Sequence, residues 1–237
     1  MDSYNELITL IKSECKKINI KFSKEGDGRI TSAVKEKEYL DILVKNISKE
    51  NDKILIERPK ERFWYDIKIN NIPFNLKLST GGTDNAFNKV AILYTISGIE
   101  SKKKNMNYNQ WYKLIKESNK KTQRDNTTEY HYLVVDKDSG NILLKSILDI
   151  HSYKTNPCNI LQINWKNEFA NIDHTIENEK FNEKIQELMK AIQKSIKQSI
   201  ESMKLFAEAD IEKDFKIEEK DELSELFEKS CVVKEKE

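Results

Sequence analysis

The sequence lacks long apolar runs and has few cysteines, and both shortages exclude classes of protein. No stretch of about eighteen consecutive apolar residues occurs, and the N-terminus has no basic region leading into an apolar one, so we expect neither membrane insertion nor secretion. The three cysteines are far apart and have no paired spacing, which predicts neither a zinc knuckle nor a disulfide framework. A reducing, cytoplasmic environment suits such a chain, and we expect no membrane partner.

Metal-binding histidine pairs and phosphate-binding glycine loops are also missing. His131, His151 and His174 are isolated and lack ligand spacing, so a histidine-centred metal nuclease is poorly supported, and ordinary surface or core histidines are the simpler interpretation. Gly81-Gly82 is not followed by a GK[ST] element, which excludes the phosphate-loop NTPases.

The composition is that of a folded, polar protein with an uneven distribution of charge. The 237 residues are 34% charged and 38% hydrophobic, which provides enough apolar material for a core and rules out wholesale disorder. The net charge of +1 divides into +6 for residues 1–209 and −5 for residues 210–237. Lysines make up 37 of the 41 basic residues, so their number alone is a weak argument for a nucleic-acid partner.

Hydrophobic periodicity predicts an α+β (mixed α/β) fold, with a central mixed β-sheet flanked by helices and a long C-terminal helical segment. The predicted helices cover residues 4–23, 30–48, 84–97 and 176–207. Thr83 or Asp84 is the expected N-cap of the third helix, and Gly98 is its expected terminator. The predicted strands form two hairpins, over residues 63–79 and 130–148. We expect a core domain over residues 1–175 and a helical segment with an acidic tail over residues 176–237.

The first hairpin places several polar side chains on one face. If Asn70-Asn71 occupy a two-residue turn, which requires positive φ and therefore suits Asn, Asp66 lies opposite Asn75. Opposite residues have Cβ atoms about 4.5–5.5 Å apart, so these two side chains can share a hard cation, with Lys77 next in the row. Alternation predicts a polar face of Trp64, Asp66, Lys68, Asn75, Lys77 and Ser79 and a packed face of Tyr65, Ile67, Phe74, Leu76 and Leu78. A half-solvated hairpin without chemistry is the alternative interpretation.

The second predicted helix carries a carboxylate on its apolar side. Glu36 shares a stripe with Leu40, Leu43 and Ile47 by spacings of four, seven and eleven, whereas Glu38 lies on the side of the lysines. An inward glutamate is commonly a helix-end or ion-pair residue, but a nearby cation would also account for it.

These residues together resemble the PD-(D/E)xK nucleases, and more narrowly the type II restriction endonucleases. That family has an acidic residue near the start of one strand, an acidic residue and a lysine one position apart on the next, and often a glutamate on a preceding helix. Asp66 matches the first acid, Asn75-Leu76-Lys77 stands where the second acid and the lysine belong, and Glu36 matches the helix glutamate. Tyr65 replaces the usual proline, and Asn75 replaces the second carboxylate. The resemblance covers roughly residues 28–166.

The resemblance implies a restriction-endonuclease-like fold and Mg²⁺-dependent hydrolysis of double-stranded DNA. Asp66, the backbone carbonyl of Leu76, and Glu36 through water would hold the Mg²⁺, and Lys77 would stabilise or deprotonate the attacking water. Asn75 offers a neutral oxygen where a charged one is usual, so we expect one principal metal ion.

A basic segment over residues 101–125 suits DNA binding. It has a local charge of +6 and is interleaved with three aromatic residues, a combination that suits phosphate contact and stacking. The expected DNA contacts are Lys89, Asn85, Lys104, Trp111, Lys120, Lys121 and Arg124. A solvated lysine-rich loop is the alternative, and Asn85 and Asn88 could cap a helix instead of reading base edges.

Three functional interpretations follow, in descending order of preference. The first is a type II restriction endonuclease, for which we expect a homodimer because a two-fold recognition sequence is matched by two active sites. The second is another PD-(D/E)xK nuclease, acting in repair or junction resolution. The third is a non-catalytic nucleic-acid-binding or helical interaction protein.

Overall fold

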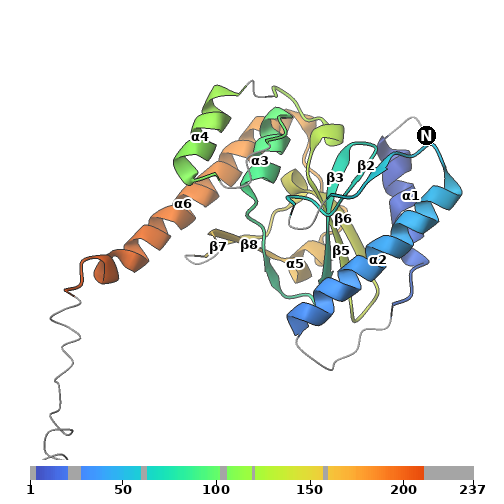
Figure 1. The fold of residues 1–237 in the computed structure, drawn as a ribbon. Coiled ribbons are helices and arrows are strands. Elements are labelled where there is room, and N and C mark those ends of the chain that lie inside the picture. The colour runs from blue at the N-terminus through green and yellow to red at the C-terminus, as the bar shows by residue number, and fades with distance from the viewer. Residues whose placement is uncertain are drawn as a thin grey trace, which may run out of the picture. The chain divides into compact units, whose positions relative to one another are not determined.

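The computed structural model describes residues 4–20, 28–59, 63–101, 106–118, 121–156 and 160–210, with only the backbone of residues 28–33. The described residues form the α+β fold that the periodicity predicts (Figure 1). The chain divides into two compact units, Met1–Ser199 and Ile200–Glu237, so the first unit extends beyond the expected boundary at residue 175. The reason is that Phe181, Leu188 and Ile192, which lie beyond that boundary, are buried in the core of the first unit.

The principal sheet is mixed and has five strands in the order β1-β2-β3-β5-β6. Its strands are β1 (Ile56–Glu57), β2 (Ile67–Ile69), β3 (Ile72–Ser79), β5 (His131–Asp136) and β6 (Ile142–Ser146). β3 and β5 are parallel, and the other neighbours are antiparallel. Both predicted hairpins are therefore present, although β2 is shorter than the pattern indicates.

Two N-terminal helices cover one face of this sheet. They are α1 (Tyr4–Lys16), which ends earlier than predicted, and α2 (Gly28–Glu50). Both bury an apolar stripe, with Ile11 of α1 and Leu43 and Ile47 of α2 fully buried. These side chains join one hydrophobic cluster with Phe74 and Leu76 of β3.

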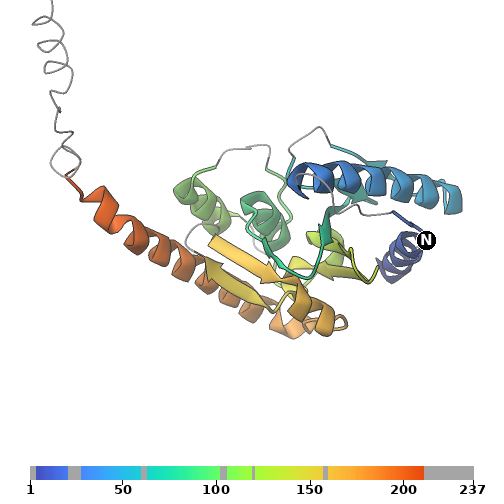
Figure 2. The same cartoon turned by 90° about the horizontal axis from the view of Figure 1, so that it is seen from below.

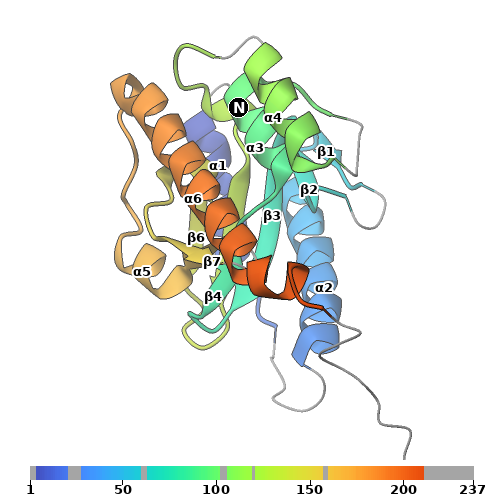
Figure 3. The same cartoon turned by 90° about the vertical axis from the view of Figure 1, so that its left-hand side faces the viewer.

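Helices cover the other face of the principal sheet (Figure 2). They enclose a second hydrophobic cluster. They are α3 (Lys89–Ser97), α4 (Tyr108–Glu117), α5 (Trp165–Ala170) and α6 (Phe181–Ala207). Figure 3 shows α4 beside α3. Short 3₁₀ turns occur at Asn126–Thr128, Ile147–Asp149 and Asn178–Lys180. None of the helices among the described residues combines the length and the apolar character needed to span a bilayer.

A second, three-stranded sheet replaces the beginning of the predicted third helix. β4 (Thr83–Asn85) pairs with β8 (Ile160–Asn164), which pairs with β7 (Tyr153–Asn156). The expected cap at Thr83 or Asp84 is therefore wrong. Asn88 caps α3 instead, because its side chain accepts the N–H groups of the first turn, whereas Gly98 ends the helix at φ 73°, as predicted.

Candidate functional site

The turn that closes the first hairpin has the predicted form. Asn70 and Asn71 both adopt positive φ, 48° and 65°, as the central residues of such a turn require. The register follows, with Ile67 paired with Phe74. Asp66, the residue before β2, consequently lies against the middle of β3.

Two carboxylates occupy the side of β3 that β2 is too short to cover. β2 has three residues and β3 has eight, so the N–H groups of Leu76 and Leu78 point past the end of β2. Asp66 Oδ2 accepts the Leu76 N–H (2.8 Å), and Glu36 Oε1 accepts the Leu78 N–H (3.4 Å). The inward orientation predicted for Glu36 is thus confirmed. We call this place, formed by Glu36, Asp66, Leu76 and Leu78, the open edge of β3.

Burial disfavours the ionised form of both carboxylates at the open edge. Desolvation raises the pKa of Asp66, an effect that the Leu76 N–H, Lys77 and Arg58 oppose. Desolvation also raises the pKa of Glu36, opposed chiefly by Lys77, and the charge of Asp66 raises it further. Added positive charge at this edge would therefore relieve an electrostatic cost that Lys77 offsets only in part.

Asp84 joins the site, and the sequence interpretation missed it. β3 ends at Ser79, and a turn with Gly81 at φ 78° reverses the chain into β4. The reversal brings Asp84 Oδ2 to 4.0 Å from Lys77 Nζ, with the Lys77 side chain 31% exposed. The available signal is an acid shortly after the Gly81-Gly82 pair, which on the sequence alone also fits a helix cap.

The relation between Asp66 and Asn75 differs from the shared cation site that we expected. The Asn75 amide nitrogen donates to Asp66 Oδ2 (2.8 Å), so the two side chains hydrogen-bond to each other. This bond and the Leu76 N–H both use Oδ2, and neither uses Asp66 Oδ1. Asn75 therefore orients the carboxylate in this structure.

The oxygen atoms at the open edge are suitable ligands for a weakly held hard cation. The carboxylates of Asp66 and Glu36 lie at one strand edge with the Leu76 C=O, which points to the same side as the Leu76 N–H. Among the described residues, no group of three or more His, Cys, Asp or Glu side chains is arranged to hold a metal ion. The set fits Mg²⁺, which commonly binds through one or two carboxylates, keeps several waters, and takes further oxygens from a phosphate substrate.

Part of the expected polar face of the hairpin is buried. Trp64 is 8% exposed and packs in the second hydrophobic cluster, and Tyr65 joins it there instead of lying with Ile67, because both residues precede β2, where strand alternation does not apply. Lys68 is also buried, and its Nζ donates to Glu100 (2.7 Å). The chemistry of this face is thus confined to the residues near β3.

Two of the expected DNA contacts are corrected by the structure. Trp111 is 2% exposed, and its Nε1 donates to Lys89 C=O (2.7 Å), so its ring belongs to the core. Arg124 is held between Glu129 and Asp149, with a side chain only 6% exposed. The alternation of aromatic and basic residues in this segment suggests DNA contact, but it does not reveal that Asp149, twenty-five residues later, helps to neutralise Arg124.

The remaining expected DNA contacts vary in accessibility. Lys89 Nζ donates to Met106 C=O and lies over the Tyr108 ring, and Lys121 Nζ donates to Thr128 C=O, so both are engaged within the fold. Asn85 is exposed on β4 and stays a predicted contact. Lys104 and Lys120 lie outside the described residues.

Comparison of the sequence with protein-family models and with curated proteins finds no match.

Proposed function

We propose that this protein is a Mg²⁺-dependent endonuclease of the PD-(D/E)xK type that hydrolyses phosphodiester bonds in double-stranded DNA, and more narrowly a type II restriction endonuclease. The observation that carries the proposal is the convergence of Asp66, Glu36 and Lys77 at the open edge of β3. Three separate parts of the chain contribute these groups, namely α2, the residue before β2, and β3 itself.

The residues supply the requirements of phosphodiester hydrolysis. The oxygens of Asp66, Glu36 and Leu76 would hold the Mg²⁺, which when bound neutralises phosphoryl oxygens and makes a bound water more acidic. Lys77 provides an ammonium group beside these oxygens to stabilise the attacking water as it loses its proton. Asp84, at 4.0 Å from Lys77, keeps this side chain at the edge. Asn75 holds the Asp66 carboxylate in orientation.

Cleavage of phage DNA with Mg²⁺ by the full chain and its variants tests the proposal. We expect Asp66→Asn and Lys77→Ala to lower the cleavage rate at least ~100-fold while DNA affinity is retained, because several kcal/mol of barrier lowering are lost. Chelation of Mg²⁺ should abolish cleavage in the parent protein. Lys154→Ala, a change of an exposed lysine on β7, is the matched control for Lys77.

Two glutamates on α2 provide a candidate variant and its matched control. Glu36→Gln should slow cleavage, whereas Glu38→Gln should not, because Glu38 is 46% exposed and pairs with Lys35. Equal rates for the parent protein and the Asp66→Asn and Lys77→Ala variants would refute the site. Binding of DNA without cleavage under any metal condition would select the non-catalytic interpretation.

The products distinguish the members of this class. Discrete fragments with one sequence at every end support a restriction endonuclease, whereas nicking confined to junctions or mismatches supports a repair or junction-resolving nuclease. The expected homodimer is tested by sedimentation of the protein with and without DNA. A monomer in both conditions would contradict the two-fold symmetric arrangement.

A further inference from the structure

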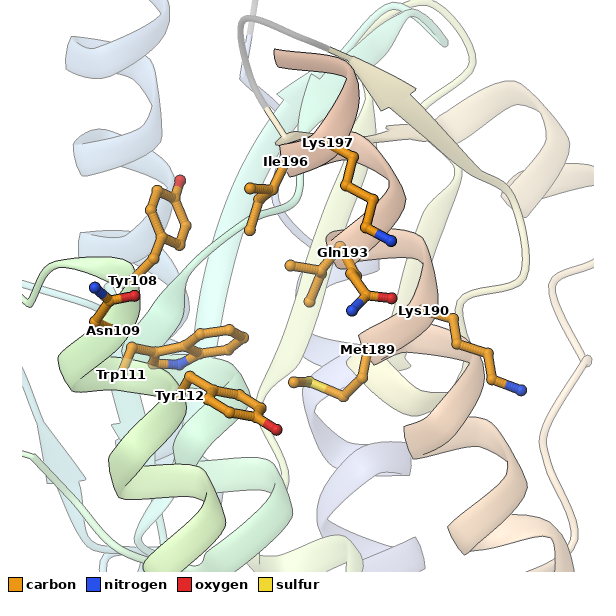
Figure 4. A pocket seen from close by; sticks show the side chains of 10 residues that line it. Tyr108, Asn109, Trp111, Tyr112, Met189, Lys190, Gln193, Ile196 and Lys197 are labelled. Atoms are coloured by element: carbon orange, nitrogen blue, oxygen red, sulfur yellow. The ribbon is translucent and has the colours of Figure 1, made fainter. Parts of the chain in front are cut away.

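A groove between α4 and α6 lies outside the site described above. Its volume is 490 Å³, within the range of about 300–1,000 Å³ that is typical of ligand sites. Figure 4 shows aromatic side chains of α4 facing an aliphatic and polar wall from α6. The rings of Tyr108, Trp111 and Tyr112 line the α4 side, and Met189, Lys190, Gln193, Ile196 and Lys197 line the α6 side.

The α4 wall consists of aromatic rings that are partly fixed in place. The Trp111 ring is held by its hydrogen bond to Lys89 C=O and by an edge contact with Phe87, with centroids 5.6 Å apart. The Lys89 ammonium lies 4.5 Å from the centroid of the Tyr108 ring. Tyr112 is 58% exposed, and no hydrogen bond within the described residues engages its hydroxyl. A ligand would therefore meet two rings that folding holds in place, Trp111 and Tyr108, and one exposed ring, Tyr112.

The α6 wall combines apolar contact with unused polar groups. Met189 and Ile196 supply the apolar surface. Gln193, Lys190 and Lys197 are exposed, and within the described part of the chain none of the three side chains has a hydrogen bond or ion pair. Residues 188–199 contain three lysines and no acidic residue. The groove is thus apolar inside, carries the side-chain amides of Asn109 and Gln193, and is bordered by positive charge.

We infer that this groove binds an unpaired nucleobase of single-stranded nucleic acid, with the base against Tyr112 and Met189 and the adjoining phosphates near Lys190 and Lys197. A base has the flat face that stacks on an aromatic ring and the polar edge that a Gln amide can bond, and its backbone carries the charge that lysines attract. A base paired in a duplex cannot enter the groove, since its faces are already stacked. The inference does not depend on the proposed nuclease chemistry.

Fluorescence anisotropy with a labelled single-stranded oligonucleotide of about twelve thymines, without Mg²⁺, tests the inference. We expect Tyr112→Ala to weaken binding roughly 5- to 150-fold, the range for loss of one base–aromatic stack. Tyr112→Phe should retain the affinity of the parent protein, because it keeps the ring. Leu114→Ala is the matched control on the same helix, since Leu114 is exposed and does not line the groove. Circular dichroism establishes that each variant is folded.

Two further probes decide what occupies the groove. An abasic oligonucleotide of equal length keeps the charge and lacks the bases, so we expect it to bind weakly and without dependence on Tyr112. Thymidine monophosphate should compete at millimolar concentration if the site recognises one nucleotide. Equal binding of the abasic and thymine strands would overturn the inference, and so would a dimer that Tyr112→Ala dissociates, because a second copy of the chain would then fill the groove.

The outcome is separable from that of the proposed function. Asp66→Asn should leave the dependence of thymine-strand binding on Tyr112 unchanged, because Asp66 does not line the groove. If the protein cleaves DNA but its binding of the thymine strand does not depend on Tyr112, this inference alone is refuted. Tyr112-dependent binding without any cleavage would support it and count against the nuclease.

Discussion

Replacing Arg124 with methionine tests whether this residue stabilises the fold or contacts DNA. Arg124 donates to both carboxylate oxygens of Glu129 and of Asp149 over distances of 2.6–3.1 Å, and also to Ile176 C=O (2.9 Å). The side chains of the two acids are 0% and 6% exposed. Methionine fills much of the volume but leaves both buried carboxylates without their cation.

The expected loss is about 3–5 kcal/mol of unfolding free energy, which is typical when one partner is removed from a buried ion pair. For a chain of this size, this corresponds to a melting temperature lower by roughly 6–20 °C. Arg58→Met is the control, because Arg58 pairs with Asp41 at partly exposed positions and should cost at most about 1 kcal/mol. Adding Glu129→Gln to Arg124→Met should recover part of the loss, since one uncompensated charge is removed.

The pH dependence of this loss has a definite sign. Burial raises the pKa of Glu129 even though Arg124 opposes the shift, so removing Arg124 raises this pKa further. A folded-state pKa above the unfolded value means that stability falls as pH rises through the interval between them. The deficit of Arg124→Met should therefore be smaller at about pH 5 than at about pH 8. Urea unfolding at both pH values measures it. A deficit below about 1 kcal/mol, together with weakened DNA binding, would refute the structural role and restore the DNA contact.

Three further changes have expected outcomes. Asn71→Val should destabilise by about 1–2 kcal/mol and Asn71→Gly should not, because φ is 65° there; thermal melting of both variants measures this. Burial lowers the pKa of His131 to about 4, below the ordinary value of about 6.5, so its contribution to stability is present near pH 7 and is lost as pH falls towards 4, up to about 3 kcal/mol. Urea unfolding at several pH values across that interval should show that the unfolding free energy of His131→Leu depends less on pH than that of the parent protein. Glu100→Gln should destabilise by about 1–3 kcal/mol in thermal melting, because it removes the negative charge that lies 2.7 Å from the buried Lys68 ammonium, and an unchanged melting temperature would contradict this.

Local patterns predicted the part of the candidate site that lies on one hairpin. The Asn70-Asn71 turn sets the register, and the register alone places Asp66 beside Asn75. The apolar stripe of α2 was enough to turn Glu36 inward. These signals act over a few residues, where the periods of helix and strand determine which side chains share a face.

The remainder of the site depends on contacts between distant segments. Asp84 reaches Lys77 because β4 pairs with β8, some eighty residues later, and no local feature of Thr83–Asn85 distinguishes that strand from a helix start. The burial of Arg124 depends on Asp149, twenty-five residues away. A charged residue has the same appearance in a sequence whether its partner is water, a phosphate or a buried acid.

The unequal lengths of β2 and β3 have a consequence for how this site can vary. Both carboxylates lie beside the part of β3 that has no β2 residue opposite it. The width of this gap is therefore set by the position at which β2 ends and not by the conformation of a surface loop. Sequence drift in the connecting loops would leave the spacing of the acids intact. Extending β2 by two paired residues at its N-terminal end would fill the gap with main chain and eliminate the site while the fold survived.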